Sequence, residues 1–212
     1  MKNLRVRDIL IIVANLVLIA AEVLGLRMSM IEDGMIDFRF YTELANAFSL
    51  IAAIVYIVFM LISVFREKEI PKFVSLLKYA SVISLAVTMI IVAVVLAPFY
   101  DNAYGVLLFS GSYFFYHTLA PLIALISFIF IEEHDIKGII DNLIGISPTV
   151  LYGVVMTILN IAKVIQGPYP FLMVYKNTLG MSIIWFAGII GGTFLLAELL
   201  EFVSSKGKKV IK

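Results

Sequence analysis

The chain has 212 residues, of which 62% are hydrophobic and 15% are charged, and its formal net charge is +1. A soluble domain is about 45–50% apolar. With a larger apolar fraction, a soluble fold would expose many apolar side chains to water, whereas a lipid bilayer can surround them. The near-neutral charge gives no long-range field that would attract nucleic acid, and we expect no such partner. The sequence contains no cysteine, which excludes disulfides, thiolate metal sites and cysteine nucleophiles.

Six long apolar runs follow one another, separated by segments rich in charged and turn residues. A helix needs about 20 apolar residues to cross the bilayer, and runs of this length without strict alternation indicate helices rather than barrel strands. The first run follows basic residues as a signal peptide does, but it is long and no small-residue cleavage site ends it, so we expect a retained helix. The sequence predicts one all-α domain, residues 1–212, a polytopic six-helix bundle with spans Ile9–Leu26, Tyr41–Phe65, Leu76–Ala97, Leu107–Ile131, Pro148–Ile165 and Met181–Val203.

The orientation follows from the basic residues, which favour the cytoplasmic side of a membrane. Of the 16 Lys and Arg residues, 12 lie at the N-terminus, between the second and third runs or at the start of the third, after the fourth run or at the C-terminus. The remaining four are Arg27, Arg39, Lys163 and Lys176. This split predicts a multi-pass cell-membrane protein with both termini in the cytoplasm and with external loops over residues 28–40, 98–103 and 166–177.

Polar residues inside membrane spans are rare and often mark function. At 1.5 Å per residue, most of the strongest ones fall in the outer half of the membrane, while Asn15 lies near mid-depth. Their helical spacing predicts faces that converge on one outward-opening cavity. The residues of this predicted site are Glu22, Thr42, Asn46, Tyr113, His117, Asn160 and Lys163.

Several of these residues also have a purely structural interpretation. Asn46 and Asn160 are equally typical of hydrogen-bond partners between helices. Lys163 fits a side chain that extends to the outer interface, or one that pairs with Glu22. Arg39 fits either an interfacial anchor or a ligand for the carboxylate of an acyl chain.

Thr42 and His117 supply the two parts of a nucleophile–base pair, because a hydroxyl attacks a carbonyl and an imidazole takes its proton. Along straight helices Thr42 lies roughly 12 Å higher than His117, so helix tilt must close that gap. Position alone offers supporting groups: Glu22 or Tyr113 to orient the imidazole, and Asn46 or Asn160 to donate to an oxyanion.

Metal and haem sites are not expected. His117 is the one intramembrane histidine, and His134 lies in the loop Glu132–Asp141, which is predicted to be a solvated acidic loop. No phosphate-binding loop, nucleophile elbow or HExxH motif occurs. We therefore expect no metal and no cofactor.

Three stretches carry a resemblance to a known family: Phe38 to Asn46, with the sequence FRFYTELAN; His117 to Pro121, with HTLAP; and Tyr169 to Leu172, with YPFL, followed by Gly180. In their order and spacing they resemble the androgen-induced protein family, which includes the androgen-dependent TFPI-regulating protein and bacterial relatives. Animal members place the asparagine one residue sooner than Asn46 and have a histidine-to-proline gap one residue longer. The bacterial relatives share the present spacing.

That family consists of intramembrane threonine hydrolases that act on fatty acid esters of hydroxy fatty acids. The resemblance implies that Thr42 is the nucleophile, that His117 is the base, and that Tyr169 lies near the mouth of the site. We therefore expect a hydrolase of an amphiphilic acyl ester, with Arg39, Lys163 and Tyr169 at the substrate entrance. The alternative is a small transporter or lipid-binding membrane protein that uses the same cavity without covalent chemistry.

Overall fold

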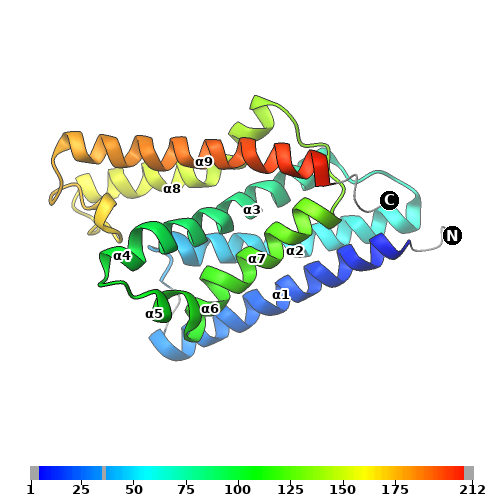
Figure 1. Ribbon diagram of the computed structural model, residues 1–212, viewed down its shortest axis with the longest axis horizontal. Helices are drawn as coiled ribbons and strands as arrows, with labels where there is room; N and C mark the ends of the chain where they lie inside the picture. The colour runs from blue at the N-terminus through cyan, green and yellow to red at the C-terminus, as the bar shows by residue number, and fades with distance from the viewer. Residues whose placement is uncertain (1–4, 35–36, 208–212) are drawn as a thin grey trace.

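The computed structural model describes residues 5–34 and 37–207, which form an all-α bundle (Figure 1). The elements in chain order are α1 (Val6–Asp33), α2 (Tyr41–Arg66), α3 (Lys72–Ile91), η1 (Val92–Leu96), α4 (Ala97–Phe99), α5 (Tyr104–Phe109), α6 (Gly111–Phe114), η2 (Phe115–Leu119), α7 (Ala120–Ile126), η3 (Ser127–Ile131), α8 (Ile139–Ile161), η4 (Pro170–Leu172) and α9 (Leu179–Gly207). Segments η1, η2 and η3 are π-helical and η4 is a 3₁₀ turn. Within the described residues, six helical rods are long and apolar enough to cross a membrane, which confirms the predicted multi-pass fold.

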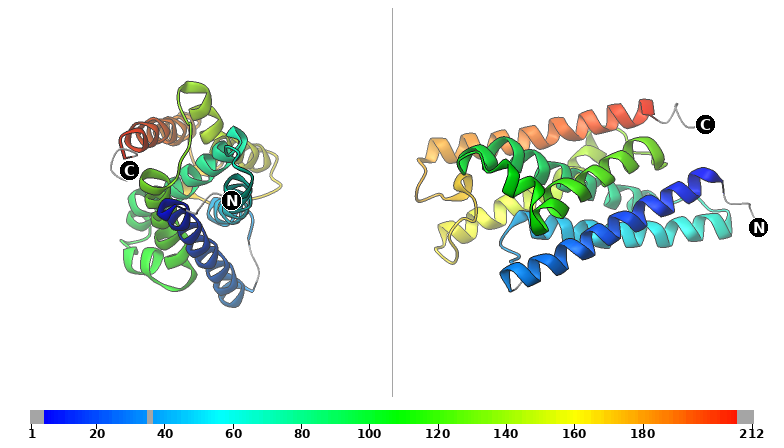
Figure 2. Two further views of the ribbon diagram at one scale, coloured as in Figure 1. Left: turned by 90° about the vertical axis from the view of Figure 1, so that its right-hand side faces the viewer. Right: turned by 60° about the horizontal axis from the view of Figure 1, so that its bottom comes forward.

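The six rods run side by side, and the two ends of the described chain lie at the same end of the bundle (Figures 1 and 2). We call this the terminal end, and we call the opposite end, where α1 finishes and α2 begins, the Thr42 end. Helix α3 is central, because it packs against α2, α7 and α8. Helix α9 lies along α8 and is the least enclosed of the rods.

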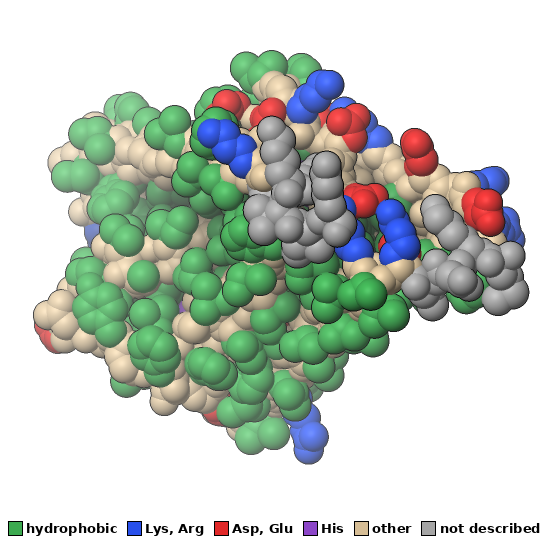
Figure 3. Space-filling model, turned by 45° about the vertical axis from the view of Figure 1, so that its right-hand side comes forward, with side chains coloured by type: hydrophobic (Ala, Val, Ile, Leu, Met, Phe, Trp, Pro, Cys, Tyr) green, Lys and Arg blue, Asp and Glu red, His purple; other side chains and the backbone are tan. Residues whose placement is uncertain are grey.

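The outer surface of the bundle is apolar. Large side chains such as Val13, Ile54, Leu151 and Ile184 are exposed along their helices. In the face drawn in Figure 3, apolar side chains cover most of the surface, and charged side chains gather toward the terminal end. A surface of this kind is stable in hydrocarbon, and the fold is that of a protein embedded in a lipid bilayer.

Several span boundaries differ from those predicted, most of all in the first and fifth helices. The first helix continues to Asp33, so residues 28–33 are helical and do not belong to a loop. The fifth begins at Ile139 and ends at Ile161, whereas the sequence predicts residues 148–165. Its first turn is stabilised by Asp141, which accepts a hydrogen bond from the Lys137 backbone and pairs with Lys72 at 3.0 Å. Lys163, with a φ of 59°, lies just beyond its end.

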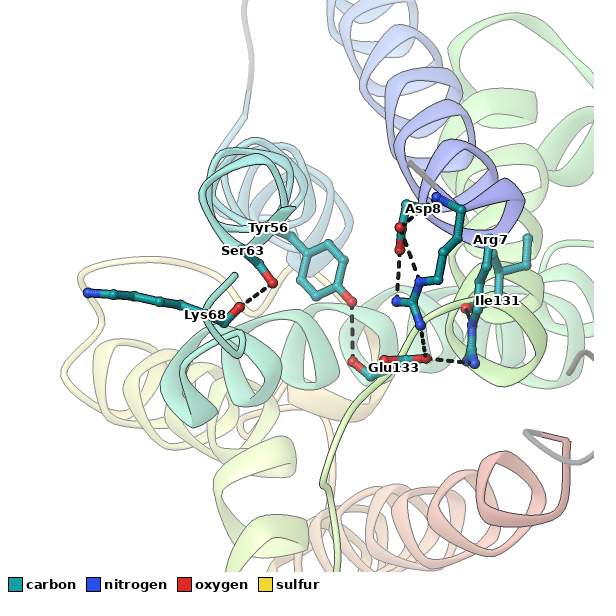
Figure 4. Close-up of polar contacts among 8 residues, drawn as sticks. Arg7, Asp8, Tyr56, Ser63, Lys68, Ile131 and Glu133 are labelled. Carbon is teal, nitrogen blue, oxygen red and sulfur yellow. Dashed lines mark hydrogen bonds and ion pairs between the residues drawn. The ribbon is translucent and has the colours of Figure 1, made fainter. Parts of the chain in front are cut away.

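Glu133 and Asp135 are exposed in the segment after η3, but the prediction of a solvated acidic loop is wrong for Glu132. Its side chain is buried and accepts hydrogen bonds from Asn15 at 2.9 Å and from Ser127 at 2.7 Å. Glu133 is held at the terminal end by an ion pair with Arg7 at 2.8 Å (Figure 4). These contacts hold the segment against α1 at the terminal end.

Two of the π-helical segments end two residues before a proline. Segment η1 precedes Pro98, and η2 precedes Pro121. Proline lacks the N–H that an α-helix needs and its ring crowds the carbonyl of the preceding turn, so the helix widens locally. The widened turn η2 carries His117.

Candidate functional site

An apolar cavity of about 660 Å³ lies at the Thr42 end, between α3, α8, α9 and the segment that carries η4. Helix α2 contributes Tyr41 and Thr42 to its wall. The polar residues of the wall are Tyr41, Thr42, Thr88, Thr149, Tyr152, Thr157, Tyr169, Tyr175 and Ser182. A cavity of this size with few polar groups is typical of a site for an apolar ligand.

Thr42 lies in the first turn of α2, where the backbone N–H groups have no partner within the helix. The N–H of Thr42 donates to the hydroxyl of Tyr169 at 3.4 Å. Tyr169 is buried between Phe40 and Phe171, and burial raises the pKa of its phenol to about 12. The phenol is therefore neutral near pH 7 and keeps a proton that it can donate beside Thr42. The sequence places Tyr169 near the mouth of the site, and the structure brings it to Thr42 itself.

His117 is held by the end of helix α5. Its Nδ1 atom lies 2.6 Å from the carbonyl oxygen of Leu107. Since a carbonyl can only accept, Nδ1 carries the proton and Nε2 presents a lone pair. The Tyr113 ring stacks on the imidazole at 5.3 Å with an interplanar angle of 8°. The imidazole is thus oriented by Leu107 and Tyr113, not by Glu22.

Leu107 is a partner that sequence reasoning missed. A backbone carbonyl carries no residue-type signal, and α5 is a separate short helix that the sequence had merged with the fourth span. The hydroxyl of Thr118 makes the same kind of bond to the carbonyl of Leu108 at 2.7 Å. His117 and Thr118 together satisfy the last carbonyls of α5, which gives His117 a structural role as well.

Thr42 and His117 do not form a direct pair. Within residues 5–34 and 37–207, no hydrogen bond joins the two side chains. Thr42 lines the 660 Å³ cavity, and His117 is not among the described residues of its wall. A nucleophile–base relay between them needs an intervening water or a movement when a ligand binds.

Glu22 and Asn46 belong to the interior between α1 and α2, away from the cavity wall. Asn46 donates to the Thr42 carbonyl on its own helix at 2.8 Å, so it is not the bridge between helices that the sequence offered as an alternative. Glu22 is fully buried, and the polar groups that interact with its carboxyl are Ser49 and Lys78. The proposed pairing of Glu22 with Lys163 is therefore wrong.

Asn160 and Lys163 contact the segment after α8, which carries Tyr169. The amide of Asn160 donates to the Ile165 carbonyl at 2.9 Å and accepts from the Val174 N–H at 3.0 Å. The Lys163 ammonium lies over the ring of Tyr175 at 5.4 Å. Asn160 thus fixes a loop; it neither bridges helices nor points at Thr42. The predicted convergence of all the polar faces on one cavity is not observed.

Arg39 lies at a second cavity of about 770 Å³, which shares Tyr41 and Tyr152 with the first. Its guanidinium pairs with Asp37 at 2.6 Å, and this bond holds the pKa of the Asp37 carboxyl below its ordinary value. The hydroxyl of Tyr152 donates to the Arg39 carbonyl at 2.7 Å. Arg39 is thus placed at a cavity rim, with its charge already partnered.

No protein family, curated protein or solved structure matches this chain. The fold and the site define a class: a six-span multi-pass membrane protein with an apolar cavity that a threonine and a buried tyrosine line at one end of the bundle. In the described part of the chain, no group of three His, Asp or Glu side chains comes together as a metal site.

Proposed function

We propose that this protein is an intramembrane hydrolase of amphiphilic acyl esters, with Thr42 as nucleophile and His117 as general base. The observation that carries the proposal is the position of Thr42 on the wall of the 660 Å³ apolar cavity, at the uncapped N-terminus of α2. An acyl chain fits the apolar part of such a cavity and brings its ester group to the polar rim. The resemblance of residues 38–46, 117–121 and 169–172 to the threonine hydrolases supports the same assignment.

The reaction runs in two halves. The Thr42 Oγ1 atom bonds to the ester carbonyl carbon while its proton passes, through an intervening water or after a movement that brings the two together, to Nε2 of His117, and the alcohol leaves with that proton. Water then attacks the acyl-threonine ester, gives a proton to His117, and the fatty acid leaves as Thr42 regains its proton. The substrate class follows from the cavity: a lipid-like ester, with the fatty acid esters of hydroxy fatty acids as the candidates that the resemblance implies.

The negative charge of the tetrahedral intermediate has two donors beside Thr42. One is the N-terminus of α2, whose dipole favours an anion. The other is the Tyr169 phenol, which is neutral and lies next to the Thr42 N–H. Tyr169 thus takes the oxyanion role that the sequence had assigned to Asn46 or Asn160.

The experiment is covalent labelling with a fluorophosphonate that carries an alkyl chain, applied to the purified protein in detergent. The activated hydroxyl should displace fluoride and leave a phosphonylated Thr42, identified by mass spectrometry. Thr42→Ala should abolish labelling, while Thr157→Ala, which removes another threonine of the same cavity, should leave it unchanged. Labelling that persists in Thr42→Ala would assign the nucleophile elsewhere.

His117 needs a variant that separates its two roles. In His117→Asn the side-chain amide can still donate to the Leu107 carbonyl, but it cannot accept the proton of Thr42. Labelling should fall by about 10²–10⁴, the usual contribution of a general base. His134→Asn is the matched control, because His134 stacks on Phe128 at 4.0 Å near the terminal end.

A lipid-binding protein or small transporter is the second candidate, favoured by the lack of a direct Thr42–His117 contact. For that function the cavity only has to hold an acyl chain, and Thr42→Ser or Thr42→Val should weaken binding modestly. Saturable binding of a fluorescent fatty acid, with no phosphonate labelling at several chain lengths, would favour this candidate over the hydrolase.

We infer that the terminal end faces the cytoplasm of a cell-membrane protein. The basic residues described at or near this end are Arg5, Arg7, Arg66, Lys68, Lys72, Lys137 and Lys206, and Lys78 is buried in the half of the bundle nearer this end. Lys2, Lys208, Lys209 and Lys212, which the sequence assigns to the same side, lie outside the described residues. The excess of basic residues supports this orientation.

A further inference from the structure

Helix α1 carries a polar residue at every seventh position on one buried face. These residues are Asp8, Asn15, Glu22 and Ser29, and none is more than 2% exposed. Seven residues make almost two full turns, so the four side chains form a stripe along the whole span. The opposite face, with Val13 and Val17, is exposed on the apolar surface.

Glu22 differs from the other members of this stripe. The other three are hydrogen-bonded: Asp8 to Arg5, Asn15 to Lys78 and Ser29 to Glu43. Both carboxyl oxygens of Glu22 are buried, and neither has a hydrogen-bond partner among the described residues. A carboxylate in this position has lost its water without gaining a donor.

The buried charges do not supply Glu22 with a counter-ion of its own. Among the described residues, Lys78 is the one cation found to interact with it, and the Lys78 ammonium already bonds to Asn15 at 2.7 Å and pairs with Glu132 at 3.5 Å. The other titratable groups that face Glu22 are Tyr116 of η2 and, beyond it, Glu43 of α2. Helix α7 brings no titratable side chain. Glu22 is therefore a buried acid that shares its nearest cation with Asn15 and Glu132.

The side chains beside Glu22 offer few hydrogen-bond donors. Apart from Lys78, the polar side chains found to interact with its carboxyl are those of Ser49 and Tyr116. An ionised carboxyl can only accept from these hydroxyls, whereas a protonated carboxyl is itself a donor and can bond to a hydroxyl oxygen. A metal cation would instead meet the positive charge of Lys78.

We propose that Glu22 is a membrane-embedded proton-binding site that exchanges its proton with the Thr42 end through Tyr116 and the Ser29–Glu43 pair. Tyr116 packs on Gly25, one turn above Glu22, and its hydroxyl interacts with both Ser29 and Glu43. Intramembrane carboxyls that take up protons from one side are a common element of proton-coupled transporters and pumps. This site is independent of the chemistry proposed for Thr42.

The test is infrared spectroscopy of the protein reconstituted in lipid at neutral pH. The carbonyl stretch of a protonated carboxyl should be present in the wild type and absent from Glu22→Gln. Glu32→Gln is the control, because Glu32 bonds to Ser112 at 2.6 Å at the end of the bundle and its loss should leave the band. Glu22→Asp should shift the band without removing it, which keeps the assignment testable if the glutamine variant does not fold.

The exchange route is tested by transfer into deuterated water. The band should shift as the carboxyl exchanges, and Tyr116→Phe should slow this shift several-fold. Tyr79→Phe, which removes a buried hydroxyl bonded to Asn142 and to the Ala197 carbonyl, should not. A wild type without the band, or a band that survives in Glu22→Gln, would overturn the proton site. Loss of the band when sodium replaces choline as the cation of the buffer would show a metal-cation site instead. An unchanged exchange rate in Tyr116→Phe would overturn the route.

Discussion

The Nζ atom of Lys78 lies 3.5 Å from the Oε1 atom of Glu132, and both side chains are 1% exposed. Asn15 completes the contact, since its amide oxygen accepts from Lys78 and its amide nitrogen donates to Glu132. One Glu132 oxygen has no partner in the described structure. The three residues join α1, α3 and the segment after η3 in the half of the bundle nearer the terminal end.

Removing one member of this pair should destabilise the protein strongly. Lys78→Met leaves the Glu132 charge buried without its cation, which typically costs about 3–5 kcal/mol. Chemical denaturation in detergent should show this loss, and adding Glu132→Gln to the same chain should recover part of it. Lys72→Met is the control, because Lys72 is 55% exposed and its pair with Asp141 should contribute little. Equal losses in the two single variants would contradict a special role for the buried pair.

The number and order of the spans could be predicted because a run of about 20 apolar residues has one stable solution in a bilayer. The boundaries could not, because they depend on tertiary contacts. Helix α8 begins nine residues earlier than predicted, where Asp141 and Asn142 find partners in α3 and α9 despite their polarity. A proline within the helix, Pro148, had suggested a start that the structure does not use.

The site was predicted less completely, because depth along a helix does not reveal which side chains meet. Glu132 was assigned to a solvated loop and Lys78 was counted only among the basic residues of the cytoplasmic side, yet they form a buried pair, since charge alone does not distinguish an exposed residue from a partnered one. The role of Tyr169 beside Thr42 depends on how the segment after α8 folds back, and no local pattern specifies that. The burial of Glu22 could be predicted, because it lies inside an apolar run.

Gly25 should tolerate alanine poorly. A Cβ atom at this position would lie 2.7 Å from the Tyr116 ring, so the ring or the helix has to move. Overpacking of this kind typically costs about 1–3 kcal/mol. Gly188 is the matched control within an apolar helix, because nothing lies within 4 Å of an added Cβ there. The unfolding temperature in detergent should be lower for Gly25→Ala than for the wild type and should be unchanged or higher for Gly188→Ala. The reverse order would contradict the packing of α1 against η2.

The orientation can be checked with single cysteines, because the native chain has none. Asn102 is exposed at the Thr42 end, and Ser205 is exposed near the terminal end. In intact cells an impermeant maleimide should label Asn102→Cys and should label Ser205→Cys only after the membrane is opened. Labelling of position 205 in sealed cells would place the terminal end outside.

Tyr169→Phe separates the hydrolase from a binding protein through a residue other than the nucleophile. The substitution keeps the ring stacked on Phe171 at 5.1 Å and removes only the hydroxyl beside the Thr42 N–H. Loss of one oxyanion donor typically lowers turnover by about 10²–10³, so phosphonate labelling and ester hydrolysis should both fall by that order. Tyr175→Phe is the control, because Tyr175 lines the same cavity while its hydroxyl donates to the Ile161 carbonyl at 2.6 Å, away from Thr42.

The affinity of Tyr169→Phe for a non-hydrolysable acyl chain should stay close to that of the wild type, because the apolar wall is intact. A binding protein would show the opposite pattern, with no covalent labelling to lose and with the two tyrosine variants alike. Equal loss of labelling in Tyr169→Phe and Tyr175→Phe would mean that the hydroxyl of Tyr169 supports only the shape of the cavity. A selective loss at Tyr169 would tie the N-terminus of α2 to the chemistry.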